Sequence, residues 1–192
     1  MRAAHIVSPD KGFIADMKLL LRSVGQGVAV SASLCCADAK NAVLSGEYDI
    51  VIVDGNLPGE PVLELAVMIT EKTNSGCLII AAPEQSDAVA DKLADAGVFL
   101  LDKPLDKTKF CRTVRLVDAC RRRLEGIRRD HQKLKRRLDE IKAVNRAKMV
   151  LMQYLKFSEE QAHRYIEKQA MDLRMTRYEI AMKVIKTYDL DV

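Results

Sequence analysis

The residue types that could do chemistry are few, and the most suggestive are an aspartate and a lysine beside apolar runs. Asp54 ends one apolar, β-branched run, Lys103 follows another, and Asp10 comes soon after a third. Charged side chains at the ends of such runs can belong to a binding site, because sites in α/β domains lie at the ends of the strands. The sequence contains no nucleophile–base pair, no Gly-rich phosphate loop and no metal-ligand cluster. We therefore do not expect an enzyme.

Apolar runs alternate with helical stretches in the part of the chain that carries these residues. Near-continuous apolar strands separated by helices are typical of a parallel sheet covered on both faces. We predict a doubly wound, five-stranded α/β domain, whose sites lie at the carboxyl ends of the strands. The expected strands are 3–7, 28–32, 49–53, 77–82 and 98–101, and the expected helices are 13–24, 38–44, 62–70 and 86–96.

The net charge of +4 conceals three segments of different character. Residues 1–111 hold ten basic and fifteen acidic side chains, residues 112–148 fourteen basic and five acidic, and residues 149–192 seven of each. An acidic domain is thus followed by a basic segment and a neutral end. Such a division is one of the better sequence indications of contact with nucleic acid.

The length and the cysteines indicate the setting. A chain of 192 residues suits one or two domains and can bury a normal core. The sequence has neither a run of about 18 apolar residues nor the pattern of a signal peptide. Five cysteines, without a paired CxxC pattern, argue against a disulfide framework. We expect a reduced cytoplasmic protein that makes no use of a membrane.

The stretch from Tyr48 to Gly59, with Asp54 and Pro58, resembles the third strand of response-regulator receiver domains, and Lys103-Pro104 resembles the Lys-Pro pair of that family. The resemblance covers residues 1 to about 120 and places Asp54 at the phospho-acceptor position. In receivers that are phosphorylated, Mg²⁺ offsets charge on the phosphoryl group as it moves to the aspartate, and the lysine pairs with the phosphate.

The chain departs from the receiver pattern at two pocket positions. Ser8 and Pro9 stand where receivers usually carry two acidic residues, which leaves Asp10 as the nearest acid, and Ala81 stands where they carry Thr or Ser. Mg²⁺ would then have a weak set of ligands, and a phosphate would lack its hydroxyl partner. Our hypothesis is a pseudo-receiver that senses a partner or another signal; Mg²⁺-dependent phosphorylation of Asp54 is the alternative.

A heptad pattern begins at Val117 and predicts a coiled coil in the basic segment, which we expect to form a parallel homodimer. The polar core residues would weaken the seam but could fix its register. The flanking cations either bind anions or form a solvated face. The predicted dimer seam is Val117, Leu124, Ile127, His131, Leu134, Leu138, Ile141 and Asn145, with Cys120 and Lys148 at further core positions.

Short amphipathic helices are expected after the coiled coil. The basic helix should end near Lys156, and Ser158 with Gln161 has the pattern of a capping box. Thr176 with Glu179 indicates the start of another helix. We therefore divide the chain into a receiver-like domain at 1–116, a coiled-coil linker at 117–145 and a helical head at 146–192.

The head carries a second resemblance, to the ANTAR domain. It rests on Ala147-Lys148 with Leu151-Met152, on Ser158-Glu-Glu with Ala162, on Ala170-Met171, and on Glu179-Ile-Ala181. The resemblance covers about 125–187. Receiver, coiled coil and ANTAR head, in this order, is an arrangement known in that family.

The ANTAR resemblance implies a transcription antitermination regulator that binds paired hairpins in nascent leader mRNA and prevents the terminator from forming, so that RNA polymerase reads through. Control would come from a sensor kinase or a sequestering regulatory protein. Such binding needs cations for phosphates and planar groups for loop bases. The candidates are Arg146, Lys148, Gln153, Tyr154, Arg164, Lys168, Arg174, Arg177 and Tyr178.

Two other functions remain open from the sequence. A DNA-binding response regulator could also carry a three-helix head, although this head is neutral and no helix has a dense basic or amide face. The other alternative is a protein-binding signalling module in which the basic segment is incidental.

Overall fold

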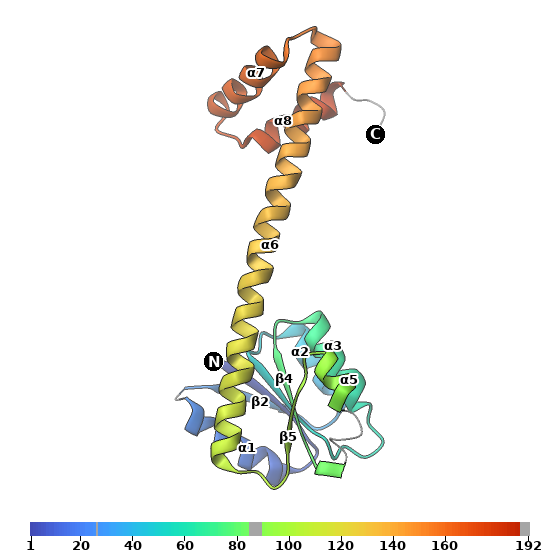
Figure 1. The fold of residues 1–192 in the computed structure, drawn as a ribbon, viewed down its shortest axis with the longest axis vertical. Helices are drawn as coiled ribbons and strands as arrows, with labels where there is room; N and C mark the ends of the chain where they lie inside the picture. Colours follow the sequence, from blue (N-terminus) through green and yellow to red (C-terminus); the bar gives the residue numbers. More distant parts are fainter. Residues whose placement is uncertain (26, 85–89, 189–192) are drawn as a thin grey trace. The chain divides into compact units, whose positions relative to one another are not determined.

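The computed structural model describes residues 1–25, 27–84 and 90–188, and the chain divides into two compact units, Met1–Gly126 and Ile127–Val192 (Figure 1). The helix α6, Lys107–Leu155, belongs to both units. The division between the units falls at Gly126, inside the segment that the sequence analysis assigned to the linker. Among the described residues, no helix combines the length and apolar character needed to span a membrane.

A five-stranded parallel sheet forms the centre of the first unit, which confirms the predicted fold. The strand order is β2-β1-β3-β4-β5, as in doubly wound sheets. Because β3 lies between β1 and β4, its carboxyl end opens toward the ends of both neighbours. The strands are β1 Ala3–Val7, β2 Ala29–Ser33, β3 Ile50–Asp54, β4 Gly76–Ala81 and β5 Phe99–Asp102.

Helices cover both faces of this sheet (Figure 1). One apolar core lies under α1, Lys11–Val24, and the first turns of α6, and includes Met17 and Phe110. The other core lies under α2, Cys36–Ser45, α3, Val62–Lys72, and α5, Ala90–Asp95. The predicted helices match these elements to within a few residues, but residues 86–89 of the helix expected at 86–96 lie outside the described residues.

The start of α6 belongs to the first unit's core, which corrects one predicted seam residue. Val117 is fully buried there, and a Cβ at Gly76 would overlap its side chain. Gly76 therefore lets α6 lie close to the beginning of β4. Because Val117 is used in this packing, it cannot also contact a second chain, and the seam prediction at this position was wrong.

The second unit contains the rest of α6 with two shorter helices, α7, Glu159–Asp172, and α8, Arg177–Tyr188. The capping box of Ser158 and Gln161 is present, and Thr176 and Glu179 bond in the same reciprocal way, as predicted. All three helices contribute to one apolar core, formed by Ala143, Ala147, Val150, Leu151, Ala162, Ile166, Ala170, Ile180, Ala181, Val184 and Ile185.

Candidate functional site

The first candidate site surrounds Asp54, where β1, β3 and β5 end. The Asp54 carboxylate is buried, with 4% of the residue exposed. The Ser8 hydroxyl donates to Oδ2 at 2.8 Å, and the Lys103 ammonium donates to Oδ1 at 2.9 Å. The backbone N–H of Asn56 also donates to Oδ1, at 3.1 Å. Asp54 and Lys103, from the ends of two different strands, are therefore brought into direct contact.

The other two predicted pocket residues have different surroundings. Asp10 caps the start of α1, where its Oδ1 accepts from the Gly12 N–H at 2.7 Å. Its carboxylate therefore stabilises a helix, and no described contact joins it to Asp54. Ala81 lies beside the pocket, because its carbonyl accepts from the Lys103 N–H at 2.8 Å and a Cβ at Gly55 would lie 2.6 Å from its Cβ.

This donor set does not fit Mg²⁺, which takes several oxygen ligands, usually including carboxylates and water. Both Asp54 oxygens already accept hydrogen bonds from protein groups, and it is the hydroxyl of Ser8 that faces Oδ2 from the end of β1. In the described part of the chain, no three His, Cys, Asp or Glu side chains are grouped for metal binding. Lys103, whose ammonium also lies 5.1 Å from the centre of the Phe13 ring, offsets the charge of Asp54 instead.

Sequence reasoning missed the role of Ser8, which it recorded only as a departure from an acidic pair. Ser8 is fully buried, and its hydroxyl also accepts from the Asp10 N–H at 3.1 Å while donating to Asp54. Its position directly after β1 was the available signal, because strand ends in this fold converge on one edge.

The second candidate site is the surface of the head, where several of the predicted cations form ion pairs with acidic residues. Lys148, only 17% exposed, bonds Glu159 at 2.8 Å and so joins α6 to α7. This hydrogen bond and the ammonium charge hold the pKa of Glu159 below its usual value. Arg164 pairs with Glu160 at 2.5 Å, and Arg177 lies 3.5 Å from Glu140.

Lys168 and Arg174 differ from these cations. Both are exposed, and among the described residues neither has an acidic partner within ion-pair distance. Arg174 adopts a left-handed conformation (φ 51°) just after α7, a backbone region that side chains rarely occupy. Of the predicted cations, these two are the best placed to bind an external anion.

Exposed aromatic rings belong to the same head as Lys168 and Arg174. Tyr154 is 52% exposed and Tyr178 41% exposed. The ring of Tyr188, which the sequence analysis did not select, lies 6.1 Å from that of Tyr154 at an interplanar angle of 31°. Gln153 and Arg146 are exposed on α6. The head therefore offers both cations and flat apolar groups to a ligand.

Comparison with protein families identifies this head. The model of the ANTAR domain matches residues 132–185. Residues 132–185 form an ANTAR domain. It contains every predicted head residue from Arg146 to Tyr178, and it begins a few residues after the start expected from the sequence resemblance.

Comparisons with individual proteins also cover the part of the chain that precedes the ANTAR domain. The chain is 27% identical to the transcriptional regulatory protein PdtaR of Mycobacterium tuberculosis over 187 residues. This match covers 95% of the present chain and 89% of PdtaR. A response regulator receiver domain protein from Clostridium thermocellum has a TM-score of 0.57 at 14% identity, covering 65% of this chain and 99% of that one. A signal receiver domain from Pseudomonas fluorescens gives the same TM-score and identity, covering 92% of its own chain. An ANTAR domain thus follows a domain with the receiver fold.

Proposed function

We propose that this chain is an RNA-binding transcription antitermination regulator that acts in the cytoplasm. Its ANTAR domain binds hairpins in nascent leader mRNA and keeps the terminator from forming. The observation that carries the proposal is an ANTAR domain in which Lys168 and Arg174, both exposed and without acidic partners among the described residues, belong to the same small head as exposed tyrosines. The resemblance to a transcriptional regulatory protein supports the same function.

The chemistry of this surface suits an RNA hairpin. Lys168 and Arg174 would bind phosphate oxygens, and Tyr154 and Tyr178 would stack on bases splayed out of the hairpin loop. Lys148 takes a different role in the proposal, because its ammonium is engaged by Glu159. It holds α7 against α6 and so positions the surface that contacts RNA.

A homodimer would present two such heads to paired hairpins. Five of the predicted seam residues are more than half exposed in the single chain, and they recur with the spacing of a coiled coil. Pairing with a second copy would remove this apolar surface from water. These residues are Leu124, Ile127, Leu134, Leu138 and Ile141.

The receiver-like domain would control the head without the usual phosphorylation chemistry. Lys103 and Ser8 already satisfy the Asp54 carboxylate, so the pocket does not need Mg²⁺ to offset its charge. We propose a pseudo-receiver that responds to a sequestering regulatory protein. A sensor kinase is the alternative partner, and Mg²⁺ would be a cofactor only with it.

An electrophoretic shift with a tandem-hairpin leader RNA tests the function. We expect the full chain to shift this RNA, and the variant Lys168→Gln/Arg174→Gln to lose most of the affinity. The matched control is Lys18→Gln/Lys40→Gln, which removes the same charge from exposed positions of the first unit. Tighter binding to duplex DNA at the same salt concentration would favour a DNA-binding regulator, and binding to neither would favour a protein-binding module.

A further inference from the structure

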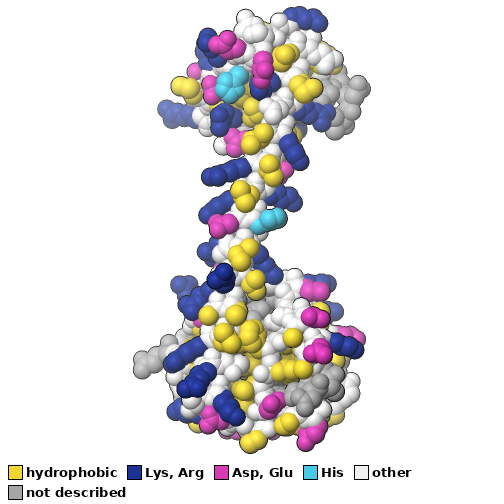
Figure 2. All heavy atoms as spheres, in the orientation of Figure 1, with side chains coloured by type: hydrophobic (Ala, Val, Ile, Leu, Met, Phe, Trp, Pro, Cys, Tyr) yellow, Lys and Arg dark blue, Asp and Glu magenta, His cyan; other side chains and the backbone are white. Residues whose placement is uncertain are grey.

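Three cations on α6, Lys133, Arg136 and Arg137, are not used by the fold or by the head surface described above. We call them the cationic band. Their spacing of three and four residues places them side by side on the helix. All three are exposed, and no acidic residue lies between His131 and Leu138 in the sequence. Figure 2 shows Lys and Arg side chains projecting from this middle part of α6.

The cationic band lies inside the ANTAR domain but outside its packed core. The family match begins at residue 132, whereas the apolar core of this unit begins at Ala143. Residues 131–139 are all exposed. This part of the domain therefore does not serve the packing of α7 and α8 on α6.

The charges of the band are poorly compensated within the chain. Lys133 lies 3.4 Å from Asp130, but both side chains are more than 70% exposed, and pairs of this kind contribute little. No acidic residue in the described part of the chain forms an ion pair with Arg136 or Arg137. Adjacent like charges on a helix repel each other. A polyanion that binds across all three would relieve this repulsion and release its own counterions.

We propose that the cationic band binds the phosphate backbone of the hairpin stem and extends the RNA surface of the head along α6. The inference rests on the proposed RNA-binding function. Contacts of this kind position a nucleic acid without reading its sequence. The head would then recognise the loop, while the band adds affinity that depends on salt.

The salt dependence of RNA affinity tests the band. Fluorescence anisotropy with a labelled tandem-hairpin leader RNA is measured at several salt concentrations for the full chain and for Lys133→Gln/Arg136→Gln/Arg137→Gln. Each lost phosphate contact should reduce the slope of log affinity against log salt by about 0.7 to 0.9. We therefore expect a slope smaller by about 2 and an affinity at least about tenfold lower at 0.1 M salt.

Two control variants separate this role from other effects. Lys18→Gln/Lys40→Gln/Lys72→Gln removes the same net charge from exposed positions of the first unit and should leave the slope unchanged. Lys133→Arg/Arg136→Lys/Arg137→Lys keeps the charge and should bind as the original chain does. Sedimentation of each variant checks that its oligomeric state is the same.

The outcomes distinguish the inference from the function on which it rests. If the original chain binds the RNA but the band variant has the same slope, the inference is overturned and the proposed function stands. A full chain that binds no RNA at any salt concentration would overturn both. The inference is supported if the band variant has a smaller slope of log affinity against log salt while the charge-preserving variant keeps the slope of the original chain.

Discussion

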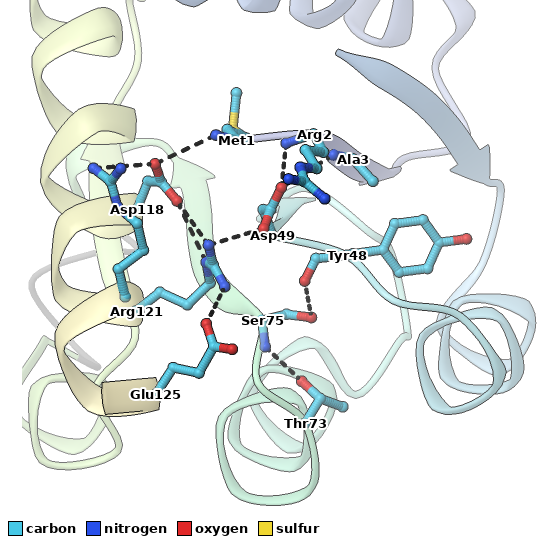
Figure 3. A network of polar contacts seen from close by, with 11 residues as sticks. Met1, Arg2, Ala3, Tyr48, Asp49, Thr73, Ser75, Asp118, Arg121 and Glu125 are labelled. Atoms are coloured by element: carbon cyan, nitrogen blue, oxygen red, sulfur yellow. Dashed lines mark hydrogen bonds and ion pairs between the residues drawn. The ribbon is translucent and has the colours of Figure 1, made fainter. Parts of the chain in front are cut away.

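Arg121 on α6 lies 2.9 Å from Asp49, the residue that immediately precedes β3 (Figure 3). Asp49 also accepts from the backbone N–H groups of Arg2 and Ala3, so one carboxylate joins α6 to two neighbouring strands. The same guanidinium lies 3.2 Å from Asp118 and 3.3 Å from Glu125. The strand that carries Asp54 at its carboxyl end is thus tied to α6 at its amino end.

The first prediction concerns the stability of the first unit. Arg121→Ala should lower its free energy of unfolding by about 1 to 3 kcal/mol, because it leaves partly buried carboxylates without their cation. Urea unfolding, followed by hydrogen exchange in β1 and β3, measures the change. Arg122→Ala is the control, because Arg122 is 64% exposed on its side chain and should contribute less than about 0.5 kcal/mol. If Arg121→Ala unfolded at the same urea concentration as the control, Arg121 would not stabilise the first unit in this way.

The second prediction concerns pH. Burial by itself would raise the pKa of Asp49, but the N–H groups of Arg2 and Ala3 and the Arg121 guanidinium outweigh burial and hold it below the ordinary value of 3.8. Since the folded pKa is lower than the unfolded one, this contribution is complete above the unfolded pKa and is lost as pH falls through the folded pKa. Urea unfolding should therefore show a steeper loss of stability below pH 3.8 than in Asp49→Asn. Parallel profiles of the two proteins would show that Asp49 does not contribute.

The fold could be predicted from the sequence to a large extent, because buried parallel strands are nearly all apolar and their alternation with helices leaves few topologies. The caps at Ser158 and Thr176 were likewise predictable, because they depend on residues three positions apart. The burial of Val117 in the first unit was not predictable, because the heptad pattern cannot tell whether an apolar residue faces its own domain or a second chain. The pairing of Lys148 with Glu159 was missed for a related reason: it joins two helices across a turn.

The third prediction concerns Asp54. Incubation with acetyl phosphate and Mg²⁺ should leave the intact mass of the chain unchanged, because the Ser8 hydroxyl and the Lys103 ammonium already bond to the two oxygens of the carboxylate. Mass spectrometry of the intact chain checks this result, with Asp54→Ala as the control. A stoichiometric phosphoryl adduct that disappears in Asp54→Ala would rule out the pseudo-receiver.

The fourth prediction concerns the coiled coil. Leu138→Glu should convert a dimer to a monomer in sedimentation equilibrium, because it places a charge in the apolar seam of both chains. Leu19→Glu is the matched control, because Leu19 is 64% exposed on the first unit, compared with 56% for Leu138. If the unmodified chain sediments as a monomer, or if both variants dissociate alike, the seam is not the dimer interface.

The most direct test of the central claim is ultraviolet crosslinking of the chain to RNA in cells, followed by sequencing of the RNA recovered with it. We predict enrichment of leader transcripts in which paired hairpins precede a terminator, and loss of this enrichment in Lys168→Gln/Arg174→Gln. Recovery of no RNA above the level of that variant would contradict the account.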